Sequence, residues 1–291
     1  MAAVLEFFDD PATFLKVAGD HLALDPVLNT VVATIAEREC RDGFTGDYPH
    51  WYAVARTSRG DVAGVAMRTA PFRPYPLFVL PMPEPAARGL AAALHERGED
   101  VGGANGALPA ARQFAEESAR LAGRTVEVQM HTRLFELREV VPPPTPNGEL
   151  RPAGPADTDL ALEWFRAFHH EADEQAGRPP ADHHQSAVTR EDMVARIESG
   201  GLWFWEVDGE RVHLTGANPP SFGAARIGPV FTPQQHRGHG YASATVAAVS
   251  QHILDGRARP CLFTDQANPV SNAIYQRIGY APVADMVNLL C

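Results

Sequence analysis

The chain has 291 residues, of which 45% are hydrophobic and 21% charged, so it can build a hydrophobic core and its composition argues against disorder. The formal net charge is -11, with 25 Lys and Arg against 36 Asp and Glu, and no stretch forms the basic face that nucleic-acid binding needs. This length predicts two domains of about 150 residues rather than one.

The three cysteines, Cys40, Cys261 and Cys291, are far apart and match no disulfide framework or metal-binding spacing. We therefore expect reduced thiols, no metal and a cytoplasmic location. No segment approaches the ~20 apolar residues of a membrane span, and "MAAVLEFFDDPATFLK" lacks the features of a secretory leader. Neither a membrane nor a nucleic acid is an expected partner.

The first half of the chain predicts strands followed by helices and a further strand. The residue patterns favour a hairpin at 51–68, a strand at 75–81, helices at 84–98 and 108–123, and one or two strands at 124–137. A proline-rich stretch, "VVPPPTPNGEL" (140–150), follows, and consecutive prolines favour an extended linker. We divide the chain there, into a domain of residues 1–140, a linker of 141–148 and a domain of 149–291.

The second half predicts the same order of elements more clearly. Asp157 or Thr158 can cap a helix, Gly200 can end the next helix, and Asp208-Gly209 is typical of a hairpin turn. The expected strands are 148–153, 225–233, 260–265 and 280–290, the expected hairpin is 202–217, and the expected helices are 159–174, 190–200, 241–256 and 268–279. The repeated order predicts an α/β (α+β) fold of two tandem copies, one of which has lost its motif.

The join between the strand at 225–233 and the helix at 241–256 carries two glycines, Gly238 and Gly240. The first turn of a helix has unpaired amides and partial positive charge, and glycine lets successive amides converge on one anion. Neither nucleotide motif fits, because the Walker lysine is missing, position 243 is serine, and no acidic residue stands near Pro260. On the glycines alone, a flexible turn and an anion site remain equal alternatives.

The surroundings of this turn resemble the acyl-CoA signature of the GNAT superfamily of N-acetyltransferases. Gln235, Gly238 and Gly240 match (Q/R)-x-x-G-x-(G/A). One strand later, Asn268 and Tyr275 match Asn-x(6)-Tyr, and Ile278-Gly279-Tyr280 follows. The resemblance covers roughly residues 148–291 and is strongest between 226 and 283. It implies two tandem GNAT-like domains, each with a mixed, mostly antiparallel sheet flanked by helices.

The resemblance also implies roles for individual residues. Backbone amides in the turn would hold the pyrophosphate of acetyl-CoA, Val230 would contact the pantetheine arm, and Asn268 with Ser271 would bind the cofactor arm. Tyr275 would act as the general acid, although a tyrosine on an amphipathic helix is also an ordinary core residue. Pro229, which has no amide hydrogen, fits a strand that diverges from its neighbour to admit the cofactor. The implied pyrophosphate-binding residues are Gln235, His236, Arg237, Gly238, His239, Gly240 and Tyr241.

The general base is not evident, because Phe263 stands where some relatives have glutamate. The candidates are a water chain and five side chains: Glu206, Glu171, Asp182, His183 and His184. Residues 169–185 are rich in histidine and carboxylates, but their spacing matches no metal site, so we expect a mobile substrate loop. We expect Trp203, Phe204 and Trp205 to be core residues, part of which could line an acceptor pocket.

These observations predict an N-acetyltransferase that moves acetyl from acetyl-CoA to the primary amine of a small molecule or peptide by direct attack. The acidic surroundings favour a cationic acceptor. Position 112, seven after Asn105, is arginine, so the N-terminal domain should bind no CoA and instead wall the acceptor cleft. The alternatives are a non-catalytic acyl-CoA-binding or regulatory module and a tRNA-dependent aminoacyl transferase, which the net acidity disfavours.

Overall fold

The structure is a computed structural model, and it describes residues 4–43, 50–69, 76–175 and 188–291. Asp10 caps the first helix by accepting a hydrogen bond from the Thr13 amide at 2.8 Å. The elements of the first half are β1 (Val4–Phe8), α1 (Pro11–Leu24), α2 (Thr30–Asp42), β2 (Trp51–Arg56), β3 (Val62–Arg68), β4 (Leu77–Val79), α3 (Glu84–Glu96), β5 (Gly103–Ala107), α4 (Ala110–Ala122) and β6 (Glu127–Glu136).

The second half begins after the proline-rich stretch. Thr189 caps α7 through a reciprocal capping box with Asp192, and Gly200 follows the helix with a φ of 70°, as predicted. Its elements are β7 (Glu149–Pro152), α5 (Thr158–Gln175), α7 (Arg190–Glu198), β8 (Leu202–Val207), β9 (Glu210–Ala217), β10 (Ala224–Phe231), α8 (Tyr241–Asp255), β11 (Arg259–Asp265), α9 (Pro269–Arg277) and β12 (Ala281–Leu290).

Both predicted hairpins form. β2 pairs with β3, and β8 pairs with β9 in antiparallel register. Asp208 and Gly209 at the second turn have φ values of 50° and 82°, which suit the right-handed twist of a two-residue hairpin. The fold class predicted from the sequence, a mixed and mostly antiparallel α/β arrangement in two tandem units, is confirmed.

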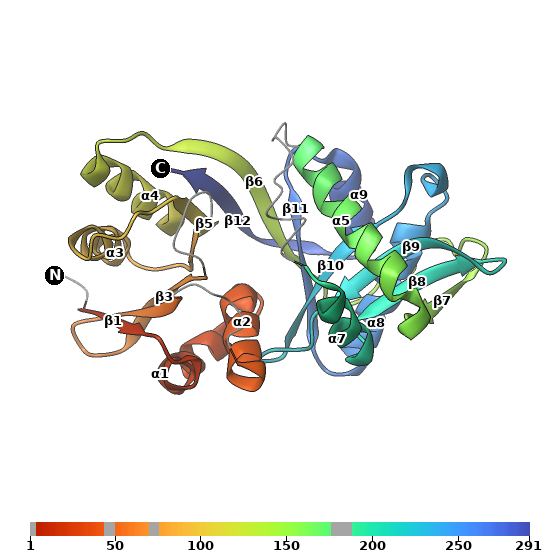
Figure 1. Ribbon diagram of the computed structural model, residues 1–291, viewed down its shortest axis with the longest axis horizontal. Coiled ribbons are helices and arrows are strands. Elements are labelled where there is room, and N and C mark those ends of the chain that lie inside the picture. Colours follow the sequence, from red (N-terminus) through yellow and green to blue (C-terminus); the bar gives the residue numbers. More distant parts are fainter. Residues whose placement is uncertain (1–3, 44–49, 70–75, 176–187) are drawn as a thin grey trace.

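The described strands form one sheet that runs through both halves of the molecule (Figure 1). Its strand order is β1-β2-β3-β4-β5-β12-β6-β11-β10-β9-β8-β7. The last strand of each half therefore crosses into the other half: β12 pairs with β5, and β6 pairs with β11. At the centre, β12 and β6 pair with each other.

The exchanged strands complete the cores of their new neighbours. Val287 and Leu289 of β12 pack in one cluster with Phe114 of the N-terminal half. Phe135 of β6 packs with Val246 of the C-terminal half. A cut at the predicted linker, 141–148, would therefore take one strand of the sheet away from each half.

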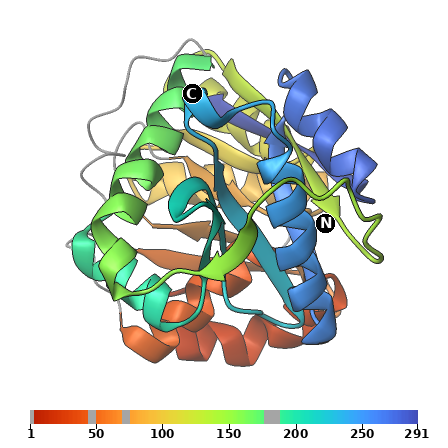
Figure 2. The same ribbon diagram turned by 90° about the vertical axis from the view of Figure 1, so that its right-hand side faces the viewer.

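Helices cover both faces of the sheet in each half. In the C-terminal half, α8 and α9 pack on one face and α5 and α7 on the opposite face. Figure 2 shows α5 (green) and α8 (blue) on the two sides of these strands. Within the described residues, no helix is both long and apolar enough to cross a membrane.

Candidate active site

The strand β10 separates from β11 partway along its length. The parallel pairing of the two strands extends only from Ala224 to Arg226. On its other side, β10 pairs with β9, but the register shifts between Ile227 and Val230. This irregularity contains Pro229, which has no amide hydrogen, so the structure places a bulge and a strand opening where the sequence predicted a divergence.

Val230 lies at the far side of this bulge. Its backbone is in register with Thr215 of β9, and its side chain packs against the core beneath α8. The side chain is therefore structural.

The helix α8 begins immediately after two glycines in left-handed conformations. Gly238 has a φ of 83° and Gly240, the N-cap, a φ of 85°. A Cβ at either position would meet no atom within 4 Å, so open space lies next to both. The first amide with a backbone partner is that of Ala244, which donates to Gly240 at 3.0 Å. Within residues 188–291, all of which are described, the amides of 238–243 have no backbone hydrogen-bond partner.

The side chains of this turn contribute less charge than the sequence suggested. The Arg237 guanidinium pairs with Glu171 of α5, and its Nε donates to the Thr232 carbonyl at 2.9 Å. His236 Nε2 lies 3.3 Å from a carboxylate oxygen of Glu210. His239 stacks on Tyr241 with ring centroids 5.5 Å apart, and Gln235 is exposed. The free backbone amides and open space therefore fit a diphosphate better than the side chains do.

Tyr275 is buried on α9 within the core that includes Ile227 of β10. Its ring meets that of Tyr280 edge to face at 5.9 Å. Burial raises the pKa of the Tyr275 hydroxyl, so this group stays protonated at neutral pH. It can serve as a proton donor but not as a base.

Asn268 is the N-cap of α9, where its Oδ1 accepts from the Ser271 amide at 3.1 Å. A residue that the sequence did not single out, Asn272, holds the same turn. Its amide nitrogen donates to the carbonyl of Asn268 at 2.8 Å and to that of Asp265 at 3.1 Å. The only sequence signal for this role was an amide side chain four residues after a cap.

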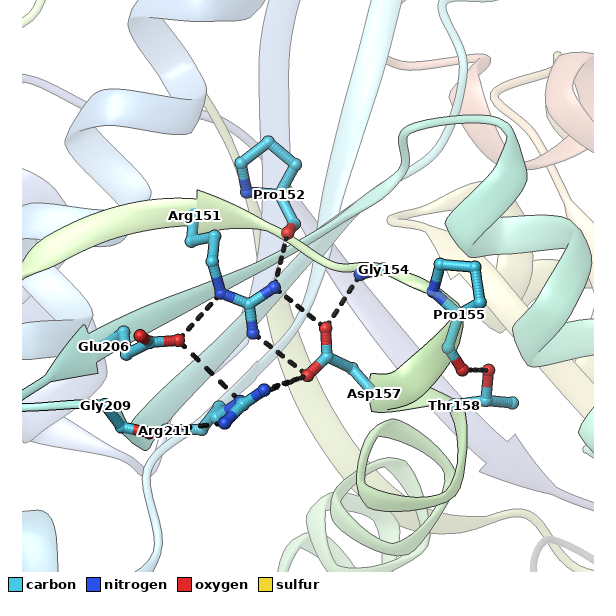
Figure 3. Close-up of polar contacts among 9 residues, drawn as sticks. All are labelled: Arg151, Pro152, Gly154, Pro155, Asp157, Thr158, Glu206, Gly209 and Arg211. Atoms are coloured by element: carbon cyan, nitrogen blue, oxygen red, sulfur yellow. Dashed lines mark hydrogen bonds and ion pairs between the residues drawn. The ribbon is translucent and has the colours of Figure 1, made fainter.

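Two candidate bases are bound in ion pairs. Figure 3 shows Glu206 next to Arg151, whose Nε donates to it at 2.8 Å, and Arg211 lies 3.8 Å from the same carboxylate. Glu171 pairs with Arg237. The other candidates, Asp182, His183 and His184, lie outside the described residues. In the part of the chain that the structure describes, no three His, Cys, Asp or Glu side chains gather as metal ligands.

His213 of β9 is a buried polar residue that the sequence did not single out. Its two ring nitrogens lie 2.7 Å from the hydroxyls of Thr215 and Thr232. Burial lowers the pKa of His213 to about 3, so the ring is neutral. The triad joins β9 to the end of β10 next to the bulge.

The environment of Asp157 predicts how the free energy of unfolding depends on pH. Burial opposes its charge, but hydrogen bonds from Arg151 and from the Gly154 amide outweigh burial and lower the pKa of Asp157 to about 2. The carboxylate therefore stabilises the fold above an ordinary Asp pKa near 4, and this stability is lost as the pH falls toward 2. We expect Asp157→Asn to lower the free energy of unfolding by roughly 2 kcal/mol at pH 7 and by less at pH 3.

Urea unfolding at both pH values measures this difference. The matched control is Asp159→Asn, because the Asp159 side chain is 82% exposed and its ion pair with Arg190 lies at the surface. An equal loss of stability at pH 7 and pH 3 in the Asp157 variant would contradict the account.

The comparisons with known proteins concern the segment that holds this site and the fold of the whole chain. Residues 220–287 match the family described as FR47-like protein. None of the curated proteins compared with the chain matches it. The matched residues include the bulge of β10, the glycine turn and the helix that carries Tyr275.

Solved structures match over almost the whole chain. A GCN5-related N-acetyltransferase from Sphaerobacter thermophilus has a TM-score of 0.59 at 17% identity, covering 99% of this chain and 94% of that one. A GNAT-family acetyltransferase from Colwellia psychrerythraea has a TM-score of 0.54 at 11% identity, covering 99% of both chains.

A tandem GNAT protein from the clavulanic acid biosynthesis pathway has a TM-score of 0.56 at 16% identity. That match covers 99% of this chain and 98% of the other, so it includes both halves. At these identities the likeness concerns the fold. The chain therefore has the tandem GNAT fold, with an FR47-like segment at residues 220–287 in its C-terminal half.

Proposed function

We propose that the protein transfers an acetyl group from acetyl-CoA to a primary amine at the C-terminal half of the molecule. One observation carries the proposal: within residues 188–291 the amides of 238–243 have no backbone partner, open space lies next to Gly238 and Gly240, and this turn follows the strand β10, which leaves β11 after Arg226. The GNAT fold supports acyl transfer in general.

The amides at the start of α8 would hold the diphosphate, because this helix end combines unpaired donors with partial positive charge. His236 and His239 would stand at the rim of that site. The backbone at Val230 would align the pantetheine arm, and one amide of the bulge would stabilise the oxyanion. Acetyl-CoA would supply the acetyl group and the thiol that leaves.

Tyr275 would donate a proton or hydrogen bond to the departing thiolate, since its hydroxyl is protonated and buried. Asn268 and Ser271 would position the cofactor arm from the first turn of the same helix. Glu206 and Glu171 are both ion-paired, so we propose that water, rather than either of them, removes the amine proton. Asp182, His183 and His184 lie outside the described residues and stay candidates for the same role.

The N-terminal half would form a wall of the acceptor cleft and bind no CoA. Asn105 is the residue of the N-terminal half that was compared with Asn268, the asparagine of the C-terminal motif. It lies in the middle of β5, opposite Asn288. It therefore cannot head a helix as Asn268 does.

Tyr275→Phe tests the proposal. We expect kcat to fall about 100-fold or more, since general acid catalysis contributes roughly 10²–10⁴-fold, while the Kd for CoA is unchanged. Thiol release from acetyl-CoA across a panel of amines gives the rate, and calorimetry gives the Kd.

Tyr280→Phe is the matched control, because it makes the same change in the adjacent buried ring. Its hydroxyl lies 2.8 Å from Ser250 within the core, so we expect lower stability with little change in kcat. Equal rates in the wild type and the Tyr275 variant would exclude Tyr275 as the acid. CoA binding without turnover of any amine would favour the regulatory module, and salt-dependent tRNA binding would favour the aminoacyl transferase.

A further inference from the structure

Arg226 is a partly buried cation at the end of the paired segment of β10. Its neighbours in the strand, Ala225 and Ile227, face the core under α8. Because side chains alternate along a strand, Arg226 faces the opposite side, where α2 contacts β10. Its Nη1 is buried and has no hydrogen-bond partner among the residues that the structure describes.

Two more guanidinium groups lie near Arg226. Arg196 of α7 stands over the ring of Phe165, with its Cζ 5.4 Å from the ring centroid, and Arg38 comes from α2. Burial lowers the pKa of Arg226, and charge repulsion from Arg196 and Arg38 lowers it further. Arg38 belongs to α2, which contacts β10, and Arg196 belongs to α7, which packs on the same face of the sheet as the one that Arg226 faces. Figure 1 shows α2 and α7 at the junction of the two halves, near β10.

The groups near these cations do not form ion pairs with them. Burial raises the pKa of the Cys261 thiol, opposite Arg226 in the register, to about 11, so it is uncharged. The Asp192 carboxylate accepts hydrogen bonds from the Thr189 amide and hydroxyl at 2.9 and 3.1 Å in the cap of α7. No described carboxylate forms an ion pair with Arg226, Arg196 or Arg38 within 4 Å.

Other arginines of the same sheet have the carboxylate partner that Arg226 lacks among the described residues. Arg259 of β11 donates to both carboxylate oxygens of Glu136 at 2.7 Å. Arg151 is bound by Asp157 in the same forked manner at 2.9 and 3.0 Å. A buried polar atom without a partner costs stability, so the unpartnered Nη1 of Arg226 points to a site for an external anion.

We propose that Arg226, Arg196 and Arg38 bind an anionic group, carboxylate or phosphate, on the acceptor amine. This inference rests on the proposed function. A guanidinium presents a planar fork that matches either anion. The substrate class is then a small amine that also carries a negative charge, rather than the purely cationic amine that the net acidity favoured.

The position of Arg226 suits a small acceptor. Arg226 precedes Gly228, the first residue inside the register shift, by two positions, which at about 3.3 Å per strand residue is about 7 Å. A molecule with a few bonds between its anion and its amine can span this distance. The three arginines lie on the face opposite α8, so they do not compete with the diphosphate site.

Direct binding is the first test. Calorimetric titration of the full chain uses succinate and inorganic phosphate as probes, with succinamide as the neutral match, all at constant ionic strength. We expect an anion to bind and succinamide not to bind. Arg226→Gln should raise the Kd for the anion about 10-fold or more. Arg59→Gln, which removes an exposed arginine from the β2–β3 turn, should bind the anion as the wild type does.

Arg38 is exposed on α2, so Arg38→Gln should fold even where Arg226→Gln does not. We expect Arg38→Gln to raise the Kd for the anion severalfold. Equal binding of succinate and succinamide, or unchanged anion binding in both the Arg38 and Arg226 variants, would overturn the inference.

Acceptor preference is the second test, and it separates the two anions. β-Alanine is compared with 3-aminopropionamide, and phosphoethanolamine with ethanolamine, as acceptors of acetyl from acetyl-CoA. We expect one charged member to be preferred about 10-fold or more in kcat/KM, and Arg226→Gln to remove that preference.

The affinity for CoA, measured in the same variants, separates this inference from the proposed function. Normal CoA binding together with a preference for the neutral amines would overturn the anion site alone. If the wild type bound no CoA, the proposed function would be wrong. The titrations with succinate and phosphate would still show whether the anion site exists.

Discussion

Gly240→Ala is expected to raise the Kd for CoA about 100-fold, a loss equal to one or two charge-assisted hydrogen bonds of roughly 1.5–3 kcal/mol each. Gly240 has a φ of 85°, a conformation that costs a residue with a Cβ roughly 1–2 kcal/mol. We expect the variant to relieve this strain by turning its backbone, which would move the amides that hold the diphosphate in the proposed function. The new methyl group also enters the open space beside the turn.

Gly200→Ala is the matched control for this change. Gly200 has a φ of 70°, and a Cβ there would also meet nothing within 4 Å, but it ends α7 rather than beginning α8. Both variants should lose about 1 kcal/mol of stability in urea unfolding, whereas only Gly240→Ala should lose CoA affinity in calorimetry. Comparable affinity for CoA in the two variants would contradict the role assigned to the glycine turn at 238–240.

Val287→Asp is expected to destabilise the protein by more than about 4 kcal/mol, because it places an unpaired charge in a core. Val287 is fully buried in β12, between Gly106 of β5 and His131 of β6. Since folded proteins have stabilities of roughly 5–15 kcal/mol, this change should unfold much of the population. Both halves should unfold together, because β12 and β6 join them.

Val283→Asp introduces the same charge into the same strand at a position that is 38% exposed. We expect it to change stability by no more than about 0.5 kcal/mol. Urea unfolding followed by tryptophan fluorescence reports on both halves, through Trp51 in β2 and Trp205 in β8. Separate transitions for the two halves in the Val287 variant would contradict the coupling through exchanged strands.

Local elements of the fold could be predicted from the sequence because their causes are local. Asp208-Gly209 gave the correct hairpin turn, and Gly200 the correct helix end. The glycine turn at 238–240 was placed at the start of α8, where the structure has it. In contrast, no element was predicted for residues 4–42, which form β1, α1 and α2.

The exchange of β6 and β12 could not be predicted, because it depends on which edges of the sheet are open. Residue alternation identifies a strand but does not identify its partner more than 100 residues away. The pairing of Cys261 with Glu136, for example, has no local signal in either segment.

The ion-pair partners of charged side chains could not be predicted from the sequence either. Glu206 and Glu171 were candidates for the base, yet the structure gives each an arginine partner. In the strand "ARIGPVFTP", no sequence feature marks Arg226, because the lack of a partner for its Nη1 depends on how α2 and α7 pack around it. Ion pairs between distant segments follow from topology, and so does their absence.

Equilibrium dialysis of the full chain against radiolabelled CoA tests the central claim, that the unpaired amides at the start of α8 hold the diphosphate of the cofactor. We expect one CoA to bind per chain, and Gly240→Ala to lower that binding strongly. The account would be contradicted if the folded wild type took up no CoA, or if it bound CoA with the same affinity as the Gly240 variant.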